Sequence, residues 1–502
     1  MMDTLRIALG LALPWLLGYA WVRALRGRDA SNGWVDWGYA HFVGVLLLTL
    51  AMRGVGHAGL ALSLPVLVPV LALLTLAGAA VAWHRGHRVP VATTPGDGTR
   101  PVSTGRDPLD LRWLAYVAAA LLAWHFGTMI VEVALRPLFP WDAWTQWGTK
   151  ARVWSGLHAL APFIDWQQWL AGAAGYTDNA PNYPATVPLL QTWMALALGR
   201  FDDATINLPW LAAAVALAMA IYGQLRRIGV GGAWALFATY AVLSLPLADT
   251  HVALAGYADF HVAAAFALAV AALAAWEAHR DRYALALTIA MACLLPLLKV
   301  PGLAWGAIVI VGLLVAAFRG SWKRLAGVVM VTAVAATAIA ALVWREKMAS
   351  VTAGPPAGVL GSLVDNLFVF DNWHLLWYLL PIVVWIARRQ LGAHLRGAGA
   401  ALAAGGAFLM FVLAGTNVAN WVNDYTTVNR AILHIAPAAA AFGALLLWHW
   451  AQAHGPTQEP ATVAPGADSV ASAAAAVAQQ AVEVGDRPAE TVAQPDGRGP
   501  AE

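Results

Sequence analysis

Apolar runs long enough to cross a bilayer dominate the chain, and short polar segments separate them. A membrane span needs about 20 mostly apolar residues. Because these runs are rich in Ala and Leu and do not alternate between apolar and polar residues, they predict α-helices. In lipid, only helices and closed barrels satisfy every backbone hydrogen bond. The pattern predicts about 13 transmembrane helices, at Leu5–Val22, Gly38–Met52, Gly59–Trp83, Trp113–Leu135, Ile206–Leu225, Gly232–Leu247, His261–Trp276, Tyr283–Leu298, Gly302–Phe318, Leu325–Trp344, Leu375–Ala387, Ala400–Ala414 and Ala431–Trp450.

The balance of residue types places the chain in the membrane-protein class. Hydrophobic residues make up 60% of the chain and charged residues 11%, whereas soluble domains carry about 25% charged residues. The mean hydropathy is +0.63. The expected fold is therefore all-α and polytopic. The single cysteine, Cys293, excludes an internal disulfide and a cysteine-based metal cluster, and its apolar surroundings predict a small packing residue.

The distribution of Lys and Arg orients the predicted helices. Loops on the cytoplasmic side of a membrane carry an excess of basic residues. If the segment with Arg23, Arg26 and Arg28 is cytoplasmic, strict alternation gives every loop on that side at least two basic residues. The segment 136–207 then becomes a long external loop, and long loops are usually functional. Counting the short run Val187–Leu198 as a span would invert the later loops, so we expect it to lie in or partly enter the outer membrane face.

Composition divides the chain into four parts. Residues 1–88 hold three leading transmembrane helices, and residues 89–110, rich in Pro, Gly and Thr, predict a flexible cytoplasmic linker. Residues 111–450 form the main transmembrane domain. Residues 451–502 are acidic and lack the apolar side chains needed for a core, which predicts a disordered cytoplasmic tail.

Four charged residues near the predicted spans fall on the outer side. Charges at such positions are costly and are functional candidates by default. For Asp142 the simpler explanation is a solvated residue in an aromatic belt. For Asp259 it is a helix cap, and for the two basic residues it is snorkelling to the interface. Their shared face favours one site, made by Asp142 in PWDAW, Asp259 in AGYADFH, Lys299 in LLKVPG and Arg430 in NRAILH.

These residue types suit group transfer from an anionic lipid carrier. A carboxylate can take a proton from an attacking hydroxyl. It can also position a divalent cation such as Mg²⁺ or Mn²⁺, for which Asp142 and Asp259 are the candidate ligands. A lysine or arginine can hold a phosphate and stabilise the charge of a phosphate leaving group. The sequence leaves metal dependence open.

The external loop supplies further candidates for substrate contact. Tryptophan rings stack on sugars, although interface anchoring explains most of them. The asparagine lies between two prolines and could contact an acceptor or simply form a turn. The candidates are Trp141, Trp144, Lys150, Asn182 and Tyr183.

The order of these motifs resembles a known family. From about Trp113 to Pro437 the chain is similar to bacterial GT-C glycosyltransferases of the dolichyl-phosphate-mannose-mannosyltransferase-like group, related to glycosyltransferase family 39. The similarity comprises the loop acid in PWDAW, the element NAPNYPATVPLLQTWMALALG where relatives often have His-Pro-Pro, the basic end YGQLRRIG, and the segments GYADFH, KVPG and NRAILHIAP. Two departures are that Ala143 follows Asp142 where many relatives have paired acids, and that Asn182-Tyr183-Pro184 replaces His-Pro-Pro.

The resemblance implies a fold, an activity and roles. It implies an enzyme of a bacterial cytoplasmic membrane, with its site facing the periplasm or exterior, that transfers a sugar from a polyprenyl-phosphate carrier. Asp142 would be the base in an inverting transfer, Asp259 would assist, and Lys299 and Arg430 would hold the lipid phosphate. The expected partners are the bilayer, this donor and an extracytoplasmic acceptor, and no nucleic acid. The alternatives are a transporter or flippase of a lipid-linked glycan and a non-catalytic membrane scaffold.

Overall fold

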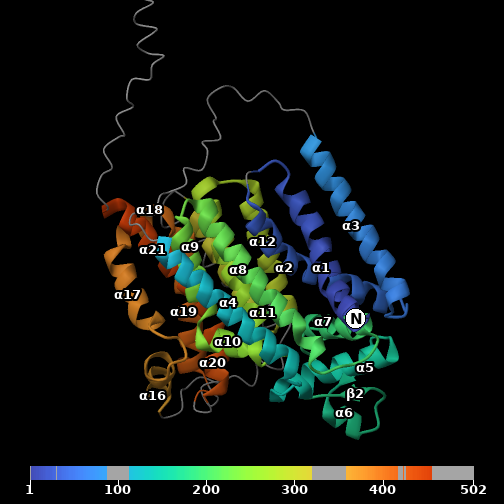
Figure 1. Cartoon of the computed structure of the whole chain (residues 1–502). Helices are drawn as coiled ribbons and strands as arrows, with labels where there is room; N and C mark the ends of the chain where they lie inside the picture. The colour runs from blue at the N-terminus through green and yellow to red at the C-terminus, as the bar shows by residue number, and fades with distance from the viewer. Residues whose placement is uncertain are drawn as a thin grey trace, which may run out of the picture. The chain divides into compact units, whose positions relative to one another are not determined.

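The computed structural model describes residues 2–29, 31–87, 112–318, 358–416, 422 and 425–454. The predicted linker at 89–110 and the predicted span Leu325–Trp344 lie outside these residues, and so does the predicted tail beyond 454. The described part of the chain is almost entirely helical, apart from one pair of parallel two-residue strands, β1 (Phe163–Ile164) and β2 (Tyr176–Thr177) (Figure 1).

The helices follow one another with few long connections. Before the long loop between α4 and α8 come α1 (Met2–Arg26), α2 (Gly33–His57), α3 (Leu64–His87) and α4 (Arg112–Leu135). The loop contains η1 (Ala143–Gly148), α5 (Thr149–Leu157), α6 (Trp166–Leu170), α7 (Thr186–Leu198) and η2 (Thr205–Asn207). Then come α8 (Leu208–Ile228), α9 (Gly232–Leu243), α10 (Pro246–Ala253), α11 (Asp259–His279), α12 (Arg282–Leu298), α13 (Gly302–Ala317), α16 (Val359–Val364), η3 (Asp365–Val369), α17 (Leu376–Ile386), α18 (Arg388–His394), α19 (Arg396–Gly415), α20 (Thr426–Leu433) and α21 (Ala436–His454).

Among the described residues, seven helices are long and apolar enough to cross a membrane. The number rises to nine if each of two bent pairs forms one span. These helices make the chain an all-α membrane protein, as the sequence predicted. Three of the other predicted spans correspond to shorter helices, α12, α13 and α17.

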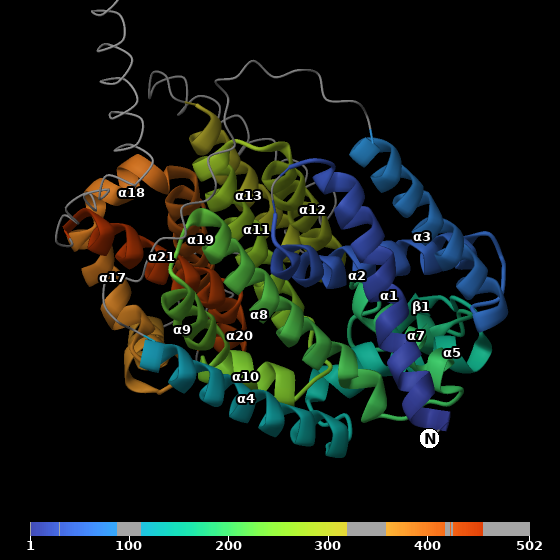
Figure 2. The same cartoon turned by 45° about the horizontal axis from the view of Figure 1, so that its top comes forward.

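Helix α11 is the centre of the core. It is apolar on every side, and a helix of that kind is buried in a large protein. Nearly all of its residues from Asp259 to Ala275 are buried. Helices α8, α12, α13 and α19 pack around it (Figure 1, Figure 2). Its many alanines allow this close approach, because small side chains let helix backbones come near one another. The residue that begins this helix, Asp259, is thereby carried into the protein interior.

Helices α1 to α3 belong to the same compact unit as the later helices. Helix α1 crosses α2 where two glycines face the opposite backbone. A Cβ on Gly18 would lie 1.8 Å from the Ala40 carbonyl oxygen, and one on Gly44 would lie 1.9 Å from that of Pro14. Helix α2 in turn packs against α8. The three leading helices therefore support the main domain through α8.

Two helix pairs are bent. Helices α9 and α10 meet at 65°, and α20 and α21 meet at 43°. Proline explains both bends, because it lacks the N–H that would continue the helical hydrogen bonding. Pro246 begins α10, and Pro437 is the second residue of α21. Each bend places polar residues close to the start of α11, since α10 and α20 both contact it.

The structure shows how two apolar segments are packed, and the expectation for Cys293 was wrong. Helix α7 covers the run Val187–Leu198, but every one of its residues is buried in protein, against α1, α2 and α5. It is therefore packed inside the protein, and its position at the outer membrane face stays a prediction. Cys293 is exposed on α12 instead of packed in the interior. An apolar residue on a membrane helix can face lipid as readily as the core, and the sequence did not separate the two.

Candidate functional site

Asp259 lies at the centre of a charged cluster. Its side chain is completely buried, which is costly for a carboxylate unless it is paired. Both oxygens have partners. Oδ1 accepts hydrogen bonds from Lys299 Nζ at 2.5 Å and lies 2.9 Å from His434 Nε2. Oδ2 accepts one from Arg430 Nε at 3.0 Å. Asp259 thus holds two cations at the N-terminal end of α11.

Arg430 joins this buried carboxylate to a more accessible one. Its Nη1 donates to Asp142 Oδ2 at 2.6 Å while its Nε donates to Asp259. The Asp142 side chain keeps 23% of its surface exposed, and that of Arg430 keeps 19%. The structure therefore brings all four charged residues predicted from sequence into one cluster. Their formal charges, two negative and two positive, cancel.

Gly256 positions Asp142 beside the cluster. Its φ is +112°, a conformation that favours glycine. A Cβ at this position would lie 2.6 Å from the Ala143 Cβ and 2.7 Å from the Leu138 Cδ1. The loop before α11 can therefore pack directly on the residues that flank Asp142. The π-helix η1 begins at Ala143, directly after Asp142, and π-helical turns are frequent at functional sites.

Two tyrosines border the cluster. The guanidinium of Arg430 lies over the Tyr257 ring, 4.2 Å from its centroid, in a cation–π contact. Burial raises the pKa of the Tyr257 hydroxyl, and the Arg430 charge opposes this effect. Burial and the Asp259 charge likewise raise the pKa of Tyr183. Tyr183, which the sequence predicted as a substrate-contact residue, is thus within electrostatic reach of the cluster.

His434 is a member of the cluster that the sequence reasoning missed. It caps the C-terminal end of α20, next to the bend before α21, and is 3% exposed. Its Nε2 faces Asp259, and its Nδ1 accepts a hydrogen bond from the Trp305 indole N–H at 3.0 Å. A signal for it was available. His434 follows Arg430 by four residues, so the two share one helix face.

Lys150 does not belong to the cluster. It is 2% exposed and pairs with Asp178 at 3.1 Å, and it also donates to the Ala180 carbonyl at 2.7 Å. Burial raises the pKa of Asp178, and the Lys150 charge acts in the opposite direction. The pair ties α5 to the segment after β2. These contacts of Lys150 therefore hold two parts of the loop between α4 and α8 together.

The other predicted loop residues lie at the protein surface. Trp141 and Trp144 are 64% and 47% exposed, and their rings meet edge to face with centroids 5.1 Å apart. They follow directly on α4, which suits both membrane anchoring and contact with a sugar. Asn182 is exposed beside the more buried Tyr183.

The cluster does not fit a divalent cation. A magnesium or manganese site needs several free oxygen ligands. Both Asp259 oxygens instead contact cationic or N–H groups, and Arg430 occupies an oxygen of Asp142. Within the described residues, no group of three or more His, Cys, Asp or Glu side chains converges as metal ligands.

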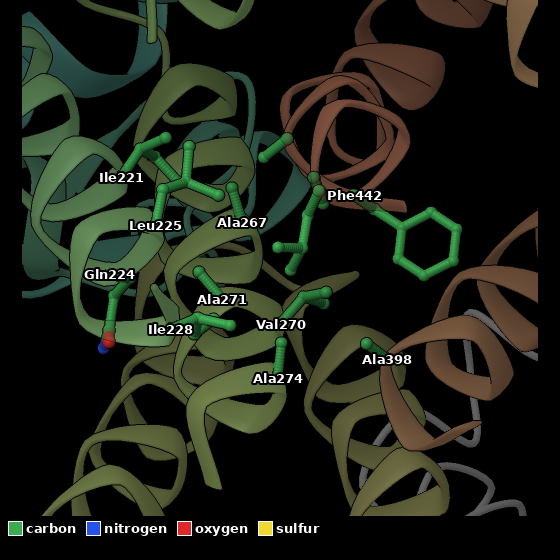
Figure 3. A pocket seen from close by; sticks show the side chains of 13 residues that line it. Ile221, Gln224, Leu225, Ile228, Ala267, Val270, Ala271, Ala274, Ala398 and Phe442 are labelled. Carbon is green, nitrogen blue, oxygen red and sulfur yellow. The ribbon is translucent and has the colours of Figure 1, made fainter. Parts of the chain in front are cut away.

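A separate apolar crevice lies among α8, α11 and α21 (Figure 3). Gln224 is the one polar residue in a lining of aliphatic and aromatic side chains, which includes Ala267, Ala274 and Phe442. At 1.5 Å rise per residue, Ala267 and Ala274 lie about 12 and 22 Å along α11 from Asp259. The crevice therefore lies apart from the charged cluster.

Comparisons with protein-family models, with curated proteins and with solved structures find no match to this chain.

Proposed function

We propose that this chain is an integral membrane glycosyltransferase that moves a sugar from a polyprenyl-phosphate carrier to an extracytoplasmic acceptor. The proposal includes a GT-C-like arrangement of about 13 spans in a bacterial cytoplasmic membrane, with the site facing the periplasm or exterior. One observation carries it. An accessible carboxylate, Asp142, shares an arginine with a buried carboxylate that also holds a lysine.

The first step is capture of the donor phosphate. Arg430 and Lys299 are two cations held side by side by Asp259, and such pairs bind phosphate oxygens. A phosphate that approaches from the exposed side competes with Asp142 for Arg430. As Arg430 turns its Nη1 toward the phosphate, Asp142 loses its ion-pair partner. Donor binding thus frees the carboxylate that the reaction needs.

The second step is the transfer. Asp142 takes the proton of the acceptor hydroxyl, and the acceptor oxygen forms a bond to the anomeric carbon of the sugar. The bond between that carbon and the phosphate oxygen breaks, and polyprenyl phosphate leaves with the bonding electron pair. Arg430 and Lys299 stabilise the charge that develops on the leaving oxygen. Asp259 remains ionised and holds the two cations throughout.

A second candidate function is transport of a lipid-linked glycan across the membrane. Two observations favour it: the bent pairs α9–α10 and α20–α21, and the charged cluster next to both. Broken helices around a polar site are typical of secondary transporters. The two functions differ in the fate of the donor, because a transporter moves it intact and a transferase splits it.

The fate of the donor therefore tests the proposal. The full chain is reconstituted in proteoliposomes with polyprenyl-phosphate hexoses that carry a radiolabelled sugar, together with extracts of envelope glycans as acceptors. We expect free polyprenyl phosphate to accumulate as the label moves to acceptor. Labelled donor that stays intact and appears on the opposite side of the bilayer would identify a transporter. Asp165→Asn is the matched control for the variant Asp142→Asn, since the Asp165 carboxylate is exposed in the same loop and makes no capping hydrogen bond.

A further inference from the structure

Behind the charged cluster, an indole N–H fixes the protonation of a buried histidine. Trp305 of α13 is 1% exposed and lies between the rings of Phe266 and Phe408, with centroids 4.8 and 5.9 Å away. Gly405 leaves room for it, since a Cβ there would lie 3.0 Å from the indole ring. The ring is thus held on three sides. Its N–H points to His434 Nδ1 at 3.0 Å.

The chemistry of this contact determines the tautomer. An indole N–H donates and cannot accept. Nδ1 of His434 must therefore be the acceptor and carry no proton. The remaining ring nitrogen, Nε2, then carries the hydrogen and donates it to Asp259 Oδ1 at 2.9 Å. A second proton on the ring would sit on Nδ1, and this N–H would then point at the indole N–H of Trp305, a donor facing a donor.

We infer that His434 is a positioning residue, held as the neutral Nε2–H tautomer by Trp305, that fixes the orientation of Asp259. The consequence rests on the proposed function: a correctly oriented Asp259 holds Lys299 and Arg430 in position to bind the donor phosphate. The charged groups that face His434 are Asp259, Lys299 and Arg430. Because His434 adds no charge, it leaves the balance of two acids and two bases in the cluster unchanged.

The first test measures the tautomer and needs no activity. Full-length protein labelled with ¹⁵N-histidine is compared by NMR with the same sample of His434→Gln, so that the missing signals belong to His434. We expect a protonated Nε2 and an unprotonated Nδ1, unchanged between pH 5 and 8. Histidine ordinarily titrates near 6.5. In Trp305→Phe the signals should begin to titrate. A charged ring or an Nδ1–H tautomer in the native chain would overturn the inference.

The second test measures positioning, with undecaprenyl phosphate in nanodiscs as the probe. His434→Leu removes both hydrogen bonds and should weaken binding at least tenfold. His434→Gln can accept from Trp305 through its oxygen and donate to Asp259 through its nitrogen, so binding should stay within about threefold, in line with the ordinary worth of a hydrogen bond. Equal binding by native, Leu and Gln forms would overturn the positioning role. Failure of the native chain to bind the probe would instead overturn the proposed donor site. The NMR experiment would still decide the tautomer of His434, because it does not depend on the probe.

Discussion

At the scale of single residues, the two acids of the cluster differ in what they can do. Asp259 is fully buried and both of its oxygens have partners, so it has no oxygen free for an acceptor hydroxyl. Removing one partner of a buried ion pair costs about 3–5 kcal/mol, because the other charge remains buried. A variant of Asp259 would therefore report on folding. Asp142 is partly exposed and shares only one oxygen with Arg430, so its replacement reports on chemistry.

Asp142→Asn should abolish sugar transfer and leave the fold intact. The amide keeps the size of the side chain and can still accept from Arg430, but it cannot take a proton. General-base catalysis contributes about 10²–10⁴-fold, so we expect a loss in that range in the initial rate of label transfer. Binding of polyprenyl phosphate should persist, because Lys299 and Arg430 remain on Asp259. Native transfer rates in this variant would exclude Asp142 as the base.

At the scale of elements, the site depends on how loops meet the start of α11. The Gly256 contact places η1, and the bend at Pro437 places α20, so that residues distant in sequence converge. Burial of α11 along its length keeps its first residue fixed. The Lys150–Asp178 pair ties α5 to the segment after β2. The site thus combines residues on helices, Asp259 and Arg430, with residues at helix ends, since Lys299 caps α12 and Asp142 directly precedes η1.

Gly256→Ala should separate Asp142 from Arg430. The added Cβ would lie 2.6 Å from Ala143, so η1 must shift, and a misplacement of about 1 Å can cost about 10²-fold in rate. We expect a loss of transfer between tenfold and a hundredfold, with a smaller change in melting temperature. Gly172→Ala is the control, because Gly172 also has a positive φ, +85°, but nothing lies within 4 Å of its Cβ position. If both variants lose activity equally, backbone strain and not the contact is responsible.

The sequence predicted the charged cluster better than it predicted the loop. Asp142, Asp259, Lys299 and Arg430 could be identified because charge beside an apolar run is rare and costly. Lys150 could not be assigned to Asp178 from the sequence, since a surface lysine and a buried one look alike until the partner is known. His434 was missed because a neutral histidine in an apolar run gives no charge signal. The burial of α7 was missed because a short apolar run fits the interface and the core equally well.

At the scale of the whole molecule, the length of α11 matches the distance between the two surfaces of a membrane. Its 21 residues, Asp259–His279, span about 31 Å at 1.5 Å per residue. The apolar part of a bilayer is about 30 Å thick. If α11 crosses the membrane, Asp259 and the cluster lie at one surface and the turn at Arg280 lies at the other. The distribution of Lys and Arg predicts that the Arg280 surface is the cytoplasmic one.

Cysteine labelling in whole cells tests this orientation. The single native cysteine, Cys293, is first replaced by alanine, and either Asn182→Cys or Arg280→Cys is then introduced; both positions are exposed. A maleimide that cannot cross membranes should label Asn182→Cys in intact cells, and Arg280→Cys only after permeabilisation. The opposite result would place the cluster on the cytoplasmic side. Soluble nucleotide sugars would then reach it and a lipid-linked donor would not be needed, since only an outward-facing site must obtain its sugar through the membrane.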